Sequence, residues 1–208
     1  PIAFGAPSDL PYPFLVDAAT SISQRGKLEH MERDGKNAPE GWAIDQKGQP
    51  YTETEPLLKD LLTRNASLLP LGGSGESHGG HKGYGYAAMV EILSASLAGG
   101  KFMKDLLGFD EHGSRVPYSL GHFFLALDVG HFIDPEHSKR ITGDIMRGLQ
   151  NADKAPDTDR IYVPGQKEYE REQERRRQGI PVGPRLRRKL SWIREVLELP
   201  HYAFLEED

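Results

Sequence analysis

The sequence contains no cysteine, which excludes disulfide bonds, zinc sites with thiolate ligands and a cysteine nucleophile. It has no apolar run near the roughly 20 residues that a membrane-spanning helix requires, and its start lacks the pattern of a secretory signal. The net charge of −5 disfavours nucleic acid as a partner. From these absences we expect a soluble, cytoplasmic protein that binds neither a membrane nor nucleic acid.

What is present is typical of a globular protein. Of the 208 residues, 37% are hydrophobic and 27% are charged, which suits one large domain or two small ones with a core that needs no cross-links. The chain opens with PIAFGAP, which has no methionine and resembles a strand already under way. Because native termini are usually polar and loosely held, we expect this terminus to be a cut end.

Short apolar segments alternate with helical patterns along the whole chain. The predicted strands lie at 14–16, 43–45, 121–128 and 161–163, and the predicted helices begin near 21 and 56 and cover 83–97, 138–150, 168–178 and 186–199. The segment 83–97 carries one charge and predicts a helix buried on most sides, and 121–128 is apolar on both faces, as in a central strand. This alternation favours an α/β fold with helices covering both faces of the sheet.

The most unusual stretch is GGSGESHGGHKGYGYAAMVEILSASLAGG at 72–100. It is not a phosphate-binding P-loop, because His81 separates Gly80 from Lys82 and a glycine follows the lysine. Residues 83–88 match the dinucleotide pattern G-x-G-x-x-A, but the residues before them predict a loop and not the strand that the pattern requires. Two interpretations stay open: an anion site where Lys82 joins a glycine-lined helix start, or a flexible turn with a solvated lysine.

Two other features of the sequence do not predict a binding site. His78 and His81 have no third ligand at a suitable position, so we predict no metal site. The basic run RLRRK at 185–189 has no aromatic residues interleaved and acidic residues follow it, so it does not predict nucleic-acid binding.

Three stretches together resemble one family. FLVDAATSISQRGKLEH, GGHKGYGYAAMVEILSASLAGG and YVPGQKEYEREQERRRQGI, with PEGWAIDQKGQP and LGHFFLALD between or beside them, resemble the malate/L-lactate dehydrogenase family, which also contains ureidoglycolate, sulfolactate and diketogulonate oxidoreductases. The resemblance covers essentially all 208 residues. It implies the family's non-Rossmann NAD(P)-binding fold, a mixed sheet covered by helices, as in sulfolactate dehydrogenase.

The resemblance further implies a site for NAD or NADP built from separated segments. Its residues would be Asp17, Ala18 and Ala19, with alanine replacing the family's methionine at 18; Lys82; Ile141, Thr142 and Gly143 at a turn or helix start; and Gly165, Gln166, Lys167, Glu168, Tyr169 and Glu170 at a proline-glycine turn. Each group has a structural alternative. Asp17 could cap the next helix, Thr142 could be an ordinary helix residue, and Glu168 and Glu170 could belong to a salt-bridged helix face.

The family's catalytic histidine and substrate-binding residues lie in an N-terminal portion that the resemblance does not find here. We therefore expect no catalytic residue in this chain, a single NAD(P)-binding region over 1–208 whose helices 168–178 and 186–199 pack as its C-terminal part, and a possible N-terminal companion segment. The predicted function is hydride transfer between NAD(P) and a small 2-hydroxy or 2-oxo acid, malate or lactate, in a homodimer. The alternatives are a ureidoglycolate, 2-oxoacid or imine reductase, and a non-catalytic nucleotide-binding or dimerisation fragment.

Overall fold

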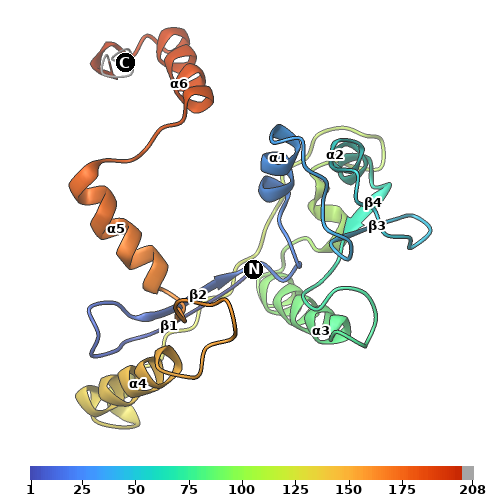
Figure 1. The fold of residues 1–208 in the computed structure, drawn as a ribbon. Coiled ribbons are helices and arrows are strands. Elements are labelled where there is room, and N and C mark those ends of the chain that lie inside the picture. The colour runs from blue at the N-terminus through green and yellow to red at the C-terminus, as the bar shows by residue number, and fades with distance from the viewer. Residues whose placement is uncertain (203–208) are drawn as a thin grey trace. The chain divides into compact units, whose positions relative to one another are not determined.

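The computed structural model describes residues 1–202 and divides the chain into two compact units, one from Pro1 to Asp144 and one that begins at Ile145. Figure 1 shows the helices and strands with their labels. The predicted single region remains a prediction.

The first unit opens with a two-stranded antiparallel hairpin. β1 (Ile2–Ala6) pairs with β2 (Phe14–Ala18), with Ile2 opposite Ala18 and Ala6 opposite Phe14. The rings of Phe4 and Phe14 meet edge to face at 6.2 Å. The strand predicted at 14–16 is thus confirmed and extends two residues further, and the opening residues form a strand as their composition indicates.

A small α/β layer follows and holds a buried core. It contains α1 (Arg25–Arg33), β3 (Ala43–Asp45), α2 (Thr54–Thr63) and β4 (Ala66–Leu68), and the two strands pair antiparallel. Leu28 of α1 and Leu57 of α2 are completely buried, and Ala38, Ala43 and Ala66 complete this core. The predicted strand at 43–45 and the predicted helices near 21 and 56 are confirmed.

α3 (Gly80–Glu91) continues directly into the π-helical turn η1 (Ile92–Ser96). The extent agrees with the predicted helix at 83–97, but the prediction that most of its surface is buried is wrong. Tyr84, Tyr86 and Ile92 are exposed, whereas the buried positions of α3 are Gly80 and Gly83. The helix packs through its small residues because only they allow the close approach to the preceding loop. The short helices η2 (Met103–Leu107) and η3 (Val129–His131) complete this unit's helical turns before α4.

The predicted central strand at 121–128 is also wrong, because these described residues follow an irregular path. The strands of the described residues form two separate two-stranded antiparallel sheets, and neither includes this segment. Phe124, Leu125 and Leu127 are exposed. An apolar run predicts burial, but a strand also needs a partner for its backbone hydrogen bonds, and the segment has none within the described sheets.

The second unit is helical. α4 (Pro135–Gln150) crosses the boundary between the units, and α5 (Gln166–Gln178) and α6 (Pro184–Val196) follow. The three predicted helices are therefore confirmed. The predicted strand at 161–163 is wrong: its last residue, Val163, is buried, and its N–H donates to a glutamine side chain instead of a neighbouring strand. Among the residues that the structure describes, no helix has the length and apolarity needed to cross a membrane.

Candidate functional site

The glycine-rich stretch presents Lys82 in the first turn of α3. The helix follows Gly79, whose φ of 83° lies in the left-handed region that glycine enters without strain. The N–H of Lys82 donates to the Gly79 carbonyl oxygen over 2.9 Å. The lysine is exposed, and its Cδ lies 3.7 Å from where a Cβ on Gly79 would be. Its aliphatic stem therefore folds back toward the glycine that precedes the helix.

Two other glycines let α3 approach the preceding loop. A Cβ on Gly83 would lie 2.0 Å from the carbonyl oxygen of Leu71, and a Cβ on Gly80 would lie 2.1 Å from that of Gly73. Side chains cannot enter such contacts. The glycines at 80 and 83 thus fix the helix against its loop, which is a packing role that the sequence pattern did not reveal.

The end of β2 is tied to the same loop by backbone hydrogen bonds. The N–H of Leu71 donates to the Thr20 carbonyl oxygen over 2.9 Å, and the N–H of Ile22 donates to that of Leu69 over 2.8 Å. Asp17, Ala18 and Ala19 directly precede this connection. The structure therefore brings the Asp17–Ala19 group and the start of α3 to one connected region of the first unit.

Asp17 does not cap a helix. It lies within β2 opposite Ala3, and the residue before α1 is Gln24. The structure thus removes the capping alternative for Asp17.

Ile141, Thr142 and Gly143 lie inside α4 and not at its start, which is Pro135. The prediction of a turn or helix start at these residues is therefore wrong. The hydroxyl of Thr142 donates to the Ser138 carbonyl oxygen over 3.2 Å, one turn earlier, and Gly143 is buried. This geometry is that of an ordinary helical threonine, and any cofactor contact of the three residues stays a prediction.

The remaining predicted residues form the start of α5. Gly165 precedes the helix with a φ of 90°. Gln166, which is 3% exposed, accepts hydrogen bonds at Oε1 from the Gln150 side chain (2.9 Å) and from the Val163 N–H (3.3 Å). Its Nε2 donates to Glu170 Oε1 over 2.9 Å. The side chain of Gln166 is thus directed into the protein.

Glu170 is held by the same network. Arg160 donates to both of its carboxylate oxygens, over 2.5 and 3.2 Å. The hydrogen bond from Gln166, followed by the pairing with Arg160, lowers the pKa of the Glu170 carboxyl against the opposing effect of desolvation. The carboxylate is therefore ionised, and it is held by Gln166 and Arg160 although its side chain is partly exposed.

Tyr162 gathers two cations beside this network. The guanidinium of Arg160 lies 4.8 Å and the ammonium of Lys167 4.5 Å from the centre of its ring, within the range of cation–π attraction. Arg160, Tyr162 and Gln150 were missed as site residues. The sequence pattern does not mark these three residues, apart from placing the charged Arg160 before Ile161 and Tyr162, because their roles arise from contacts with other positions of the chain.

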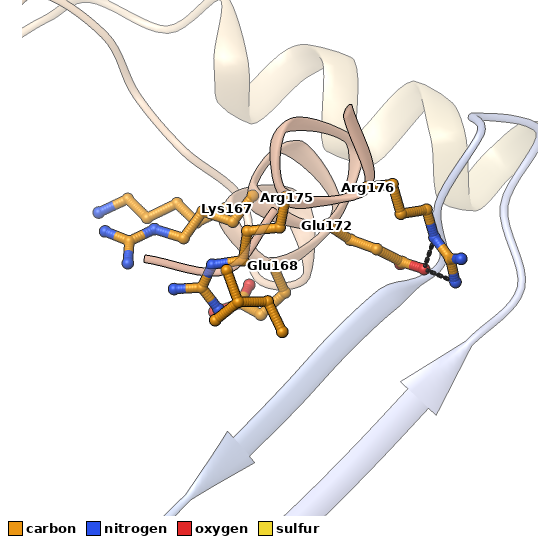
Figure 2. A pocket seen from close by; sticks show the side chains of 7 residues that line it. Lys167, Glu168, Glu172, Arg175 and Arg176 are labelled. Carbon is orange, nitrogen blue, oxygen red and sulfur yellow. Dashed lines mark hydrogen bonds and ion pairs between the residues drawn. The ribbon is translucent and has the colours of Figure 1, made fainter. Parts of the chain in front are cut away.

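A hollow of about 570 Å³ lies along α5, and Figure 2 shows the side chains that line it. It is lined by Lys167, Glu168, Arg171, Glu172, Arg175, Arg176 and Ile180. Arg176 pairs with Glu172 through bonds of 2.8 and 2.6 Å, drawn as dashed lines. The salt-bridged face considered for Glu168 and Glu170 therefore exists one turn further on, between Glu172 and Arg176.

The structure describes no group of three or more histidine, cysteine, aspartate or glutamate side chains within residues 1–202 that could hold a metal ion. His78 makes a 3.1 Å contact with the hydroxyl of its neighbour Ser77.

Comparison with known proteins gives a consistent result. A family model described as malate/L-lactate dehydrogenase matches residues 1–191. The chain is 40% identical over 193 residues to a malate dehydrogenase of Pyrococcus horikoshii, which covers 93% of this chain and 51% of that protein. It is 31% identical over 202 residues to a Δ1-pyrroline-2-carboxylate/Δ1-piperideine-2-carboxylate reductase of Pseudomonas aeruginosa, with 94% and 53% covered.

The fold agrees with this relationship. The structure matches the crystal structure of malate dehydrogenase from Entamoeba histolytica with a TM-score of 0.88 and 39% identity, over 95% of this chain and 54% of that one. The chain belongs to the malate/L-lactate dehydrogenase family, and the predicted fold class is confirmed. It spans about half the length of the curated relatives it matches.

Proposed function

We propose that this chain is part of an oxidoreductase that transfers a hydride between a nicotinamide dinucleotide, NAD or NADP, and a small 2-hydroxy or 2-oxo acid. The observation that carries the proposal is the family match over residues 1–191, together with 40% identity to a malate dehydrogenase over 93% of the chain. The chain spans about half the length of the relatives it matches, so the activity is proposed for the whole protein.

Malate is the substrate we favour, and lactate is the next. The identity of 40% to a malate dehydrogenase exceeds the 31% to the pyrroline-carboxylate reductase, and this difference supports a hydroxy acid over a cyclic imine. The second candidate is such an imine reductase. Both reactions place a hydride on a carbon next to a carboxylate, so the same scaffold suits both.

The start of α3 fits the anionic part of the cofactor. Unpaired N–H groups at a helix N-terminus attract negative charge, and the exposed Lys82 adds a full positive charge there. We assign Lys82 to a cofactor phosphate. Asp17, Ala18 and Ala19, which lead into the connection at Thr20 and Leu71, would contact the nicotinamide side. The cofactor contacts that the family resemblance implies for Ile141–Gly143 and for the turn at Gly165–Glu170 stay predictions.

The bound dinucleotide supplies the hydride chemistry, and this chain's residues bind and orient it. We place no proton-transfer residue here. The resemblance assigns proton transfer to a histidine in an N-terminal portion, so turnover would need that companion segment, and a histidine there would act as general base for oxidation and acid for reduction.

The test is a fluorescence titration of the chain with NADH and with NADPH. Replacing Lys82 by alanine removes a charge-assisted hydrogen bond of about 1.5–3 kcal/mol and should weaken binding about 10- to 100-fold. Lys47→Ala is the control, because Lys47 is an exposed lysine in a turn, and only its backbone N–H, which alanine keeps, donates to the Asp45 carboxylate. Equal affinities for both variants would contradict the assignment of Lys82.

We also propose a homodimer in the cytoplasm. The support is a run of large exposed apolar side chains: Phe124 is 88% exposed, Phe132 76% and Leu125 72%. Exposed apolar area of this kind usually marks an interaction surface. Light scattering after size exclusion should give about twice the 23.2 kDa of one chain, and a monomer at micromolar concentration would contradict the dimer.

A further inference from the structure

We propose that Gln166 positions the turn at the start of α5 for the nicotinamide dinucleotide, acting from inside the protein and not as a contact to the ligand. This inference rests on the proposed function, because it concerns the same cofactor and the segment Gly165–Glu170. It changes the role that the family resemblance assigns to Gln166 and Glu170, which is direct contact.

Gln166 clamps the turn from both sides. Its backbone N–H donates to the Val163 carbonyl oxygen over 3.1 Å, and its side-chain Oε1 accepts from the Val163 N–H over 3.3 Å. The two bonds enclose Pro164 and Gly165, which turns with a φ of 90°. Such a reciprocal pair fixes the direction in which the first turn of α5 presents Lys167 and Glu168 to the outside.

The side chain is too deeply buried to reach a ligand. Gln166 is 3% exposed, and its oxygen and its nitrogen both have partners within the protein. Gln150 approaches from the end of α4 and donates to Oε1 over 2.9 Å. A buried amide with this many partners fixes the local conformation, because each hydrogen bond lost would leave a buried polar group with no partner from water or protein.

The network requires an amide at 166 and a carboxylate at 170. Nε2 of Gln166 donates to Glu170 Oε1 over 2.9 Å, and Arg160 binds both oxygens of the same carboxylate. A glutamate at 166 would place a second carboxylate at this distance from the first. Like charges so close repel strongly, so the clamp would open even though the shape of the side chain is unchanged.

The experiment compares four forms of the chain: the natural sequence, Gln166→Glu, the double variant Gln166→Glu with Glu170→Gln, and Gln173→Glu. The double variant exchanges the amide and the carboxylate, so that an amide donor at 170 faces a carboxylate acceptor at 166. Gln173→Glu makes the same chemical change at an exposed position of α5 and serves as the matched control. NADH affinity is measured by fluorescence, and the unfolding midpoint by circular dichroism.

We expect Gln166→Glu to weaken NADH binding about tenfold or more, as the loss of a charge-assisted hydrogen bond would. The exchange should restore most of the affinity, and Gln173→Glu should bind like the natural chain. A purely structural role would lower the unfolding midpoint of Gln166→Glu with NADH affinity unchanged, and this result would overturn the inference.

Two other outcomes also count against it. Failure of the exchange to restore affinity while it restores the unfolding midpoint would mean that residue 166 or 170 contacts the cofactor directly. Failure of the natural chain to bind either dinucleotide would refute the proposed function and this inference together, whereas normal binding by Gln166→Glu with the expected loss in Lys82→Ala would refute this inference alone.

Discussion

Gly83 and Gly85 lie two residues apart in α3, and the structure predicts opposite effects when each is replaced by alanine. A Cβ on Gly83 would lie 2.0 Å from the Leu71 carbonyl oxygen and 2.7 Å from two further backbone atoms of Leu71. A Cβ on Gly85 would have nothing within 4 Å. The dinucleotide-like pattern gives both glycines the same importance, so this pair separates the packing argument from the pattern.

The magnitude follows from two opposing effects. Alanine in a helix interior is favoured over glycine by about 1 kcal/mol, and this gain applies at both positions. At Gly83 the non-bonded contact would be far shorter than the roughly 3.5–4.0 Å optimum, and the clash is with backbone, so α3 must move from its loop. Overpacking of this kind costs about 3 kcal/mol at the upper end of its usual range, which leaves Gly83→Ala destabilised by about 2 kcal/mol.

The assay is thermal unfolding by circular dichroism, with amide hydrogen exchange to localise the change to α3. For a chain of this size, about 2 kcal/mol lowers the midpoint by about 4–8 °C, and the gain at Gly85 raises it by about 2–4 °C. Because Lys82 adjoins Gly83, NADH affinity should also fall in Gly83→Ala and stay unchanged in Gly85→Ala. If Gly83→Ala were as stable as Gly85→Ala, the close contact with Leu71 would not exist.

Two further predictions concern the core of the first unit. Leu57 is completely buried, so Leu57→Ala should lower the free energy of unfolding, measured in urea, by about 2–5 kcal/mol. Leu62 lies on the same helix with its side chain 69% exposed, so Leu62→Ala should change this free energy by about 0.5 kcal/mol or less. Similar losses in the two variants would refute the assigned core. Tyr51 donates to Asp60 over 2.7 Å, and this hydrogen bond, followed by desolvation, raises the pKa of Tyr51 to about 12. Because the folded state binds this proton more tightly than the unfolded state, the contribution of Tyr51 to the free energy of unfolding should be complete below pH 10 and be lost between pH 10 and about 12. Ultraviolet titration should show one tyrosine that ionises late in the natural chain, and this tyrosine should be missing in Tyr51→Phe.

Much of the local structure was predictable because its causes are local. The helices at 138–150 and 168–178 carry apolar or charged residues at helical spacing, and neighbours three and four positions apart stabilise a helix whatever surrounds it. Gly179 follows α5 with a φ of 85°, which glycine adopts without strain. The strand at 43–45, bounded by turn residues, was confirmed for the same reason.

The errors came where burial was inferred without a partner. The segment 121–128 has the composition of a central strand, yet its path is irregular and Phe124 is exposed. Composition indicates that a segment prefers to be covered, but it does not say which distant strand supplies the hydrogen bonds. The stretch at 161–163 failed similarly, because the N–H of Val163 is satisfied by the side chain of Gln166.

The sequence by itself determined the family, the helices and the chemical character of the candidate site, including the lysine at a glycine-lined helix start. These depend on residue identity and short-range spacing. Only the tertiary structure decided that Gly83 is required for packing while Gly85 is not, and that the end of β2 joins the loop before α3. It also decided that Gln166 is buried against Gln150 and that Glu170 pairs with Arg160. The physical reason is that close approach and hydrogen-bond partnership are properties of pairs of atoms far apart in the chain, and one sequence read along its length does not contain those distances.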